Sequence, residues 1–144
     1  MTPWKHTRIC WLFSLLTAMI LAALVPGSIV IDRIESLTEV WKASSIPILS
    51  PRRVLADIEL AHNDALPASW HVTSDTIAAR VAVHLEAECL ILLKSAPLPE
   101  GADRHEAARL GLVDPMFPVV TRSLARVEYV DVREDAAAPR LLPL

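Results

Sequence analysis

Apolar and polar positions along the chain form short alternating blocks that predict an α/β fold. Stretches with apolar residues at helical spacing predict helices over 32–43, from Thr73 or Ser74 onward, and over 104–111. Alternating strands and helices indicate a mainly parallel sheet with helices on both faces. Four runs rich in apolar or β-branched residues predict the strands, which lie at 28–31, 46–49, 89–93 and 126–132.

The helix that begins at Thr73 or Ser74 has the most regular pattern in the chain. Ile77, Val81 and Leu85 recur at every fourth position. Residues four apart lie on the same side of an α-helix, so these three predict one apolar stripe. We expect this stripe to face the core of the domain.

Charged side chains stand where this helix begins and where the next strand ends. The run CLILL (89–93) is continuously apolar, which predicts a strand covered on both faces, and Lys94 lies at its carboxyl end. In parallel sheets, ligands bind near the carboxyl ends of the strands. We therefore expect Asp75 and Lys94 to share one edge of the sheet, together with the loop at Ser50.

Other segments lack such regular patterns. Residues 51–72 hold two prolines and several turn-forming residues, so we predict a long irregular loop with one helical turn around 54–60. The sequence VDPMF (113–117) predicts a turn whose methionine and phenylalanine enter the core, and we assign it no chemistry. The segment 134–144 predicts a flexible tail.

The N-terminal region contains 17 consecutive residues without a charge, at 9–25, preceded by Lys5 and Arg8. Hydropathy alone fits a signal peptide or a signal anchor. The length is at the lower limit of the roughly 17–25 residues that span a bilayer. A helix buried inside an α/β domain is the third interpretation, and the hydropathy pattern leaves all three open.

Composition indicates a folded domain and argues against two classes of site. Hydrophobic residues make up 53% of the chain, and the net charge of -3 provides no basic field for nucleic acid. Two cysteines, Cys10 and Cys89, and five histidines have no ligand-like spacing, so we predict no metal site. Because both cysteines lie in apolar runs, we expect free thiols and a cytoplasmic location.

One long block carries a resemblance to a known family. The stretch LPASWHVTSDTIAARVAVHLEAECLILLKS, followed by GLVDPMFP and VEYVDVRE, resembles the C-terminal half of the amino acid kinase superfamily. It resembles in particular the aspartate/glutamate/uridylate kinase-like branch that includes the methanofuran-biosynthesis kinase. There, an LPxSWxVTSDS stretch leads into a helix, and an apolar strand ends in Leu-Lys-Ser. This chain differs at Thr76, where the family often has Ser, and at His71, where it often has Asp.

The resemblance continues upstream through WLFSLLTAM and IPILSPRRVL, so that it covers residues 11 to 133. It implies an amino acid kinase-like fold in which residues 1–133 form a single partial domain. In that fold, 9–25 is a core helix rather than an export signal. A membrane-anchored or exported protein stays open as the alternative.

The family implies phosphoryl transfer from ATP, with Mg²⁺, to a small-molecule acceptor. The resemblance gives Asp75 the role of orienting lysines that neutralise the transferring group. It gives Lys94 a catalytic role on the nucleotide side, with Ser95 beside it in the cofactor site. The implied substrate-binding positions surround the start of the helix: Ser69 and Trp70 on the acceptor side, and Thr73 and Ser74 through hydroxyl and N–H groups.

Each of these residues also has a purely structural interpretation. Any of Thr73, Ser74 and Asp75 can cap the helix N-terminus, which is worth about 1 kcal/mol. Trp70 can pack against its own loop, and Lys94 can be a solvated charge at the end of a strand. The sequence alone does not choose between these roles and the catalytic ones.

One departure from the family is large. Amino acid kinases have two glycine-rich loops whose backbone amides cradle phosphates. This chain has three glycines, Gly27, Gly101 and Gly111, and no two are adjacent. We therefore expect a fold truncated at the N-terminus, incomplete phosphoryl transfer, and an exposed sheet that favours a homo-oligomer. The alternatives are a non-catalytic binding or assembly subunit and an exported or membrane-anchored α/β domain.

Overall fold

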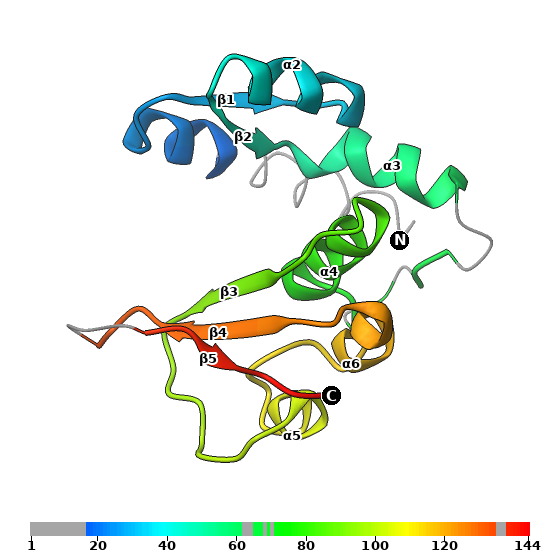
Figure 1. Cartoon of the computed structure of the whole chain (residues 1–144). Helices are drawn as coiled ribbons and strands as arrows, with labels where there is room; N and C mark the ends of the chain where they lie inside the picture. Colours follow the sequence, from blue (N-terminus) through cyan, green and yellow to red (C-terminus); the bar gives the residue numbers. More distant parts are fainter. Residues whose placement is uncertain (1–16, 62–64, 68, 70, 135–137) are drawn as a thin grey trace, which may run out of the picture. The chain divides into compact units, whose positions relative to one another are not determined.

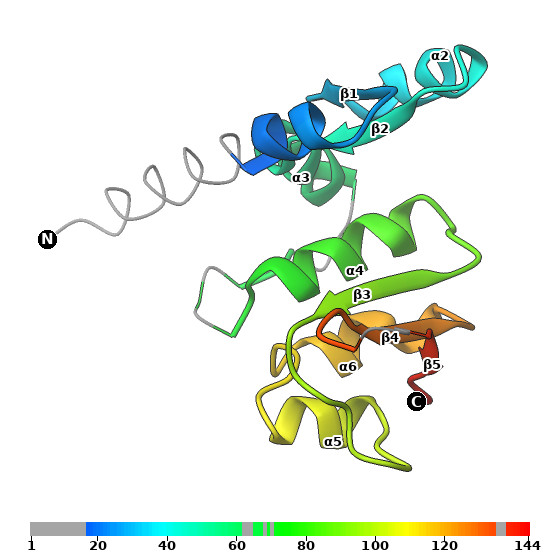
Figure 2. The same ribbon diagram turned by 90° about the vertical axis from the view of Figure 1, so that its left-hand side faces the viewer.

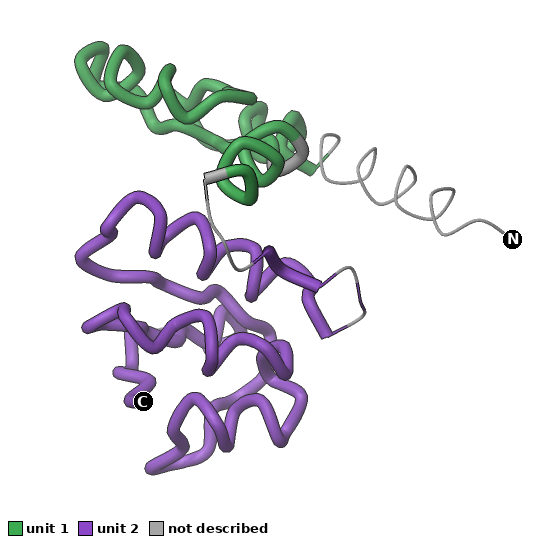
Figure 3. Tube along the Cα trace, turned by 90° about the vertical axis from the view of Figure 1, so that its right-hand side faces the viewer, with its two compact units in different colours: residues 1–64 green, residues 65–144 purple. Residues whose placement is uncertain are grey.

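The chain divides into two compact units, residues 1–64 and residues 65–144 (Figure 3). Each contains helices and a small sheet, so the predicted mixed α/β class is confirmed at this level. The amino acid kinase-like architecture and the single domain over 1–133 stay predictions. The computed structural model describes residues 17–61, 65–67, 69, 71–134 and 138–144.

Unit 1 contains a pair of parallel strands joined by a helical crossover (Figure 1). Both strands lie at the predicted positions, and the pairing runs from Ser28 opposite Ile46 to Ile31 opposite Leu49. Leu37 and Val40, on the crossover helix, are buried. The elements of unit 1 are β1 (Ser28–Ile31), η1 (Ile34–Ser36), α2 (Leu37–Lys42), β2 (Ile46–Leu49) and α3 (Pro51–Ala61).

The segment after β2 differs from the prediction, because α3 is a regular helix and not an irregular loop. Proline is tolerated in the first turn of a helix, where its missing N–H has no intrahelical acceptor, so Pro51 begins this helix instead of interrupting it. Val54 and Ile58, one turn apart, are fully buried. The turn-forming residues that suggested a loop lie after the end of α3.

The predicted N-terminal helix over 9–25 is described only from residue 17. Residues 17–24 are helical, and the part before them lies outside the described residues. Ala18 is buried, whereas Met19, Ile20 and Leu24 are exposed by 57%, 52% and 72%. Within the described residues, no helix combines the length and the apolar character needed to cross a membrane.

Unit 2 contains a three-stranded mixed sheet in the order β3-β4-β5 (Figures 1 and 2). β3 and β4 are parallel and lie at the predicted positions, whereas β5 is antiparallel to β4. The predicted helices from Ser74 and over 104–111 are present. The elements are α4 (Ser74–His84), β3 (Leu90–Lys94), α5 (Arg104–Arg109), α6 (Phe117–Val120), η2 (Thr121–Ser123), β4 (Val127–Asp131) and β5 (Arg140–Leu141).

The two faces of β3 have different surroundings, which corrects the prediction of a strand covered on both sides. Leu92 is buried in a core cluster that includes Ala79 of α4 and Phe117 of α6. Successive side chains of a strand point to opposite faces. Ile91 and Leu93 therefore point away from this core, and they are exposed by 50% and 69%.

Helix α4 buries a different side from the one predicted. Its buried residues are Thr76, Ala79, Arg80 and Ala82, whereas the predicted stripe of Ile77, Val81 and Leu85 is only half-buried. Small residues allow close approach of a helix to its neighbours, and Ala79 and Ala82 belong to the core cluster. The four-residue repeat of larger apolar residues therefore identified the helix correctly but not the side that it buries.

The C-terminal segment also differs from the flexible tail that was predicted. Leu142 is fully buried, and β5 pairs with β4 at Tyr129 and Glu128. Buried Arg104 fixes this segment, because its Nε donates to the carbonyl of Leu142 at 3.0 Å. Its other two guanidinium nitrogens donate to the carbonyls of Thr121 and Leu124. A pattern based on local sequence does not reveal such long-range contacts.

Candidate functional site

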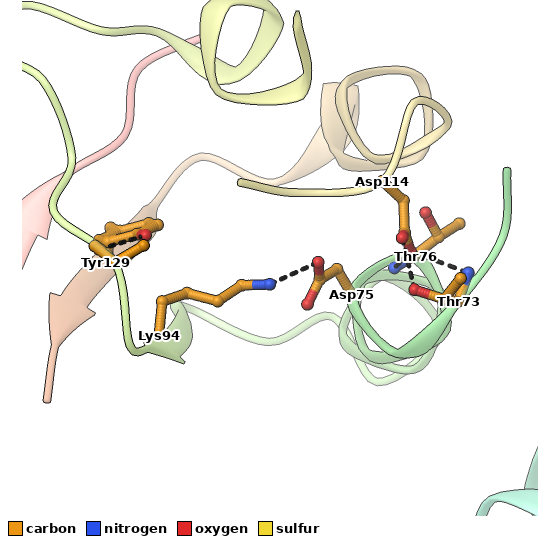
Figure 4. Close-up of polar contacts among 7 residues, drawn as sticks. Thr73, Asp75, Thr76, Lys94, Asp114 and Tyr129 are labelled. Atoms are coloured by element: carbon orange, nitrogen blue, oxygen red, sulfur yellow. Dashed lines mark hydrogen bonds and ion pairs between the residues drawn. The ribbon is translucent and has the colours of Figure 1, made fainter. Parts of the chain in front are cut away.

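Asp75 and Lys94 form an ion pair, so the expectation that these two residues share one edge is confirmed (Figure 4). Ser50 belongs to unit 1, and its place at this edge stays a prediction. The distance from Lys94 Nζ to Asp75 Oδ2 is 2.6 Å. The side chain of Lys94 is 23% exposed and that of Asp75 is 13% exposed. The pair is therefore shielded from most solvent, and a part of each side chain stays exposed.

A tight connection between α4 and β3 brings the two charges together. Two residues after the end of α4, Glu86 adopts the left-handed region, at φ 50, and the Ala87 N–H donates to the Ala82 carbonyl at 2.9 Å. This hydrogen-bond pattern closes the helix and reverses the chain direction. Since β3 then runs back alongside α4, the first turn of the helix lies near the carboxyl end of the strand (Figure 2).

The N-terminus of α4 is capped by a residue from another part of unit 2. The carboxylate of Asp114 accepts hydrogen bonds from the backbone N–H groups of Thr73 and Thr76, both at 2.9 Å. It also accepts one from the Thr73 hydroxyl. Thr73 makes no side-chain cap of its own. The N–H and hydroxyl groups that Thr73 was expected to offer a substrate are therefore bonded to Asp114.

Asp114 is buried, at 8% exposure, and it is the site residue that the sequence pattern missed. It lies in the VDPMF turn, to which no chemistry was assigned. Burial favours the neutral acid, but hydrogen bonds from Thr73 and Thr76 outweigh this and lower the pKa of Asp114. The single signal in the sequence is a carboxylate within an apolar turn, and it does not identify a partner 41 residues away.

Tyr129 supports the loop that follows Lys94. Its hydroxyl donates to the Ala96 carbonyl at 2.7 Å (Figure 4). Burial raises the pKa of Tyr129, and the carboxylates of Asp131 and Asp75 raise it further. The phenol therefore keeps its proton at neutral pH and can hold this loop as a hydrogen-bond donor.

The remaining predicted residues have fewer contacts with this centre. Ser69, Ser74 and Ser95 are exposed, and the Ser69 hydroxyl accepts a hydrogen bond from the His71 N–H at 3.3 Å. Ser95 directly follows Lys94 in the sequence. Trp70 lies outside the described residues.

The described part of the chain contains no group of three or more His, Cys, Asp or Glu residues that could hold a metal ion. The charged groups of the site are Asp75 and Lys94, joined at 2.6 Å. A lysine ammonium held by one carboxylate can still donate to an anionic oxygen, because it has three N–H groups. The arrangement is suited to orienting an ammonium toward an anion.

Comparison with known proteins adds no family to this geometry. No family model matches the sequence, and no curated protein or solved structure matches it either. The catalytic roles of Asp75 and Lys94 stay predictions. The same holds for the binding roles predicted for the residues around them: Ser69, Trp70, Thr73, Ser74 and Ser95.

Proposed function

We propose that the protein is amino acid kinase-like and takes part in ATP-dependent phosphoryl transfer to a small-molecule acceptor. The observation that supports this proposal is the shielded ion pair between Asp75 and Lys94, at 2.6 Å. It lies at the carboxyl end of a parallel strand, where ligands of α/β sheets bind. Phosphoryl transfer depends mainly on positioning and on neutralising charge, and an oriented lysine contributes to both.

In this proposal, Lys94 donates to a phosphate oxygen while Asp75 holds the ammonium in place. A partly shielded ammonium interacts more strongly with an anion than one in bulk water, because the local dielectric constant is lower. Ser74 directly precedes Asp75 and Ser95 directly follows Lys94, and both serines are exposed, so we assign their hydroxyls to the same ligand. Thr73 acts indirectly, since its hydroxyl donates to Asp114.

The residues present fit Mg²⁺ that is bound together with phosphate better than Mg²⁺ held by protein ligands alone. Mg²⁺ keeps several waters and binds through one or two carboxylates together with phosphate oxygens. Asp75 offers one carboxylate, whose Oδ2 accepts from Lys94. When bound with ATP, Mg²⁺ would neutralise charge on the phosphates. The glycine-rich cradles of the family have no counterpart in the sequence, so we expect weak binding and incomplete turnover.

Nucleotide binding can be tested by observing the lysines directly, because the chain has just three: Lys5, Lys42 and Lys94. With ¹³C-lysine labelling, a magnesium-bound ATP analogue should shift the Lys94 ε-methylene signal. Lys94→Met should abolish binding measured by calorimetry. The matched variant Lys42→Met, on α2, should bind as the wild type does. Equal binding by both variants would remove Lys94 from the proposed site.

A non-catalytic assembly subunit with the same fold is the second candidate, and the exposed side of β3 favours it. β3 is an edge strand of its sheet, and Ile91 and Leu93 are exposed by 50% and 69%. Apolar edge strands promote association between chains. On this hypothesis the protein is a homo-oligomer whose assembly survives Asp75→Asn.

Sedimentation analysis can test this second candidate. Leu93→Glu should dissociate the oligomer, whereas Leu110→Glu, an exposed leucine next to α5, should not. A monomeric wild-type protein would exclude an assembly role. We also propose a cytoplasmic location, and recovery of the protein in a membrane fraction or in the exported fraction would contradict it.

A further inference from the structure

We propose that Asp114 is a positioning residue, which holds the first turn of α4 so that Asp75 points toward Lys94. Asp114 lies between α5 and α6, and its hydrogen bonds go to Thr73 and Thr76 at the start of α4. Its effect on the ion pair passes through the backbone of α4. Only the consequence for phosphoryl transfer rests on the proposed function; the positioning itself can be measured separately.

The hydrogen bonds of Asp114 lie on both sides of Asp75 in the sequence. One oxygen, Oδ2, accepts from the N–H of Thr73 and from the N–H of Thr76, each at 2.9 Å. The other, Oδ1, accepts from the Thr73 hydroxyl. Two fixed peptide groups therefore bracket Ser74 and Asp75 and leave their backbone little freedom.

A first helical turn needs such support because its N–H groups have no partner within the helix. Terminal turns open more easily than helix interiors, and an unfastened turn would let the Asp75 carboxylate move. Thr73 provides no cap from its own side chain. In the described part of the chain, Asp114 takes over this role, and Figure 4 shows its carboxylate facing the start of the helix on the side of Thr73 and Thr76.

The same contacts indicate on which side of Asp75 an anion binds. A helix N-terminus attracts negative charge, and here the Asp114 carboxylate already provides it. A phosphate at the Thr73 N–H would have to displace a buried carboxylate and its three hydrogen bonds. The geometry therefore favours an anion beside Lys94 instead of one on the backbone of Thr73.

The test uses the full chain and the ¹³C-lysine signal of Lys94. Asp75→Asn defines the signal position of an unpaired Lys94. Asp114→Ala, which removes all three hydrogen bonds to the start of α4, should move the signal most of the way to that position. Asp103→Ala is the matched control, because Asp103 caps α5 by accepting from the Glu106 N–H at 2.7 Å. It should destabilise its own helix and leave the Lys94 signal unchanged.

A purely structural cap predicts a different result. In that case Asp114→Ala lowers the melting temperature, as Asp103→Ala does, and the Lys94 signal stays at its wild-type position; this outcome would overturn the inference. If Asp114→Ala does not fold, Thr73→Val replaces it, because it removes only the hydroxyl contact. It should shift the signal in the same direction, whereas Thr73→Ser should retain the wild-type position. An unchanged signal in Thr73→Val would then overturn the inference.

The outcomes separate this inference from the proposed function. If a magnesium-bound ATP analogue does not move the Lys94 signal of the wild type, the proposed function fails. The response of that signal to Asp114→Ala still decides whether Asp114 positions the pair. If both hold, Asp114→Ala should weaken analogue binding while the analogue affinity of Asp103→Ala stays at the wild-type value.

Discussion

Each unit places an ion pair where a parallel strand ends and a helix begins, but the two pairs differ in shielding. In unit 1, Asp32 follows β1 and pairs with Arg53 in the first turn of α3 at 3.2 Å. Both side chains are more than half exposed, at 59% for Arg53 and 57% for Asp32. In unit 2, Lys94 and Asp75 are exposed by only 23% and 13%.

The two pairs also place their charges in opposite orders. Asp75, an acid, stands in the first turn of α4, where the helix dipole stabilises negative charge. Arg53, a base, stands in the first turn of α3, where the same dipole opposes it. Exposed pairs contribute little, because water screens them and the side chains lose conformational freedom. Similar surroundings in the fold therefore produce a solvated surface pair in unit 1 and an oriented charge in unit 2.

Arg104 extends this comparison to a fully buried cation, and its removal should cause the largest loss in the free energy of unfolding. It is 2% exposed and donates to three backbone carbonyls. Hydrogen bonds to charged groups are worth about 1.5–3 kcal/mol each, so Arg104→Met should cost about 4 kcal/mol even after partial relaxation. Urea unfolding measures this loss. Arg109→Met, an exposed position on the same helix, should unfold near the wild-type midpoint.

A smaller loss of stability is expected when the buried side chain at the centre of β3, the strand that carries Lys94, is shortened. Leu92 is 5% exposed, so Leu92→Ala should destabilise unit 2 by about 3 kcal/mol through lost burial and a residual cavity. Leu93→Ala, at the next position and 69% exposed, should change stability by less than about 0.5 kcal/mol. Amide hydrogen exchange in β3 and β4 measures both. Equal losses of stability in Leu92→Ala and Leu93→Ala would contradict the conclusion that only one face of β3 is buried.

Asp114 should make unit 2 sensitive to acid. Its pKa is lowered from the ordinary value of 3.8, so its contribution to stability is complete above that pH. The contribution is lost as pH falls below 3.8 through the lowered pKa of the folded protein. The difference in unfolding free energy between wild type and Asp114→Asn should therefore shrink over this range. A difference that stays constant with pH would show that the carboxylate is not the source of the stabilisation.

Much of the local structure could be predicted because it depends on neighbouring residues. The alternation of apolar runs identified the four main strands, and the start of α4 was correct to within a residue. The meeting of Asp75 and Lys94 was predictable too, because a helix followed closely by a parallel strand brings its first turn to the strand's carboxyl end. The usual geometry of a helix–strand connection was sufficient for this prediction.

The errors concern contacts between distant segments and one misread proline. Pro51 begins α3, because a proline fits the first turn of a helix, whereas its presence among turn-forming residues predicts a loop. The link from Asp114 to Thr73 spans 41 residues, and the one from Arg104 to Leu142 spans 38. The sequence around Asp114 or Arg104 contains no local pattern that identifies the distant residue to which it is hydrogen-bonded. Polar contacts of this kind fix the site, and single-sequence periodicity does not detect them.

The smallest expected effect is the most direct test of the comparison between the two ion pairs. Lys94→Met leaves the Asp75 carboxylate shielded and without its partner, so it should cost about 1–2 kcal/mol. Arg53→Met should cost at most about 0.5 kcal/mol, because the Asp32 carboxylate is already solvated. Unfolding at low and high salt sharpens the contrast, since salt screens exposed pairs more than shielded ones. The cost of Arg53→Met should vanish at high salt, whereas most of the cost of Lys94→Met should persist. Equal costs and equal salt dependence would mean that shielding does not distinguish the pairs, and Lys94 would then be one more solvated charge at a strand end.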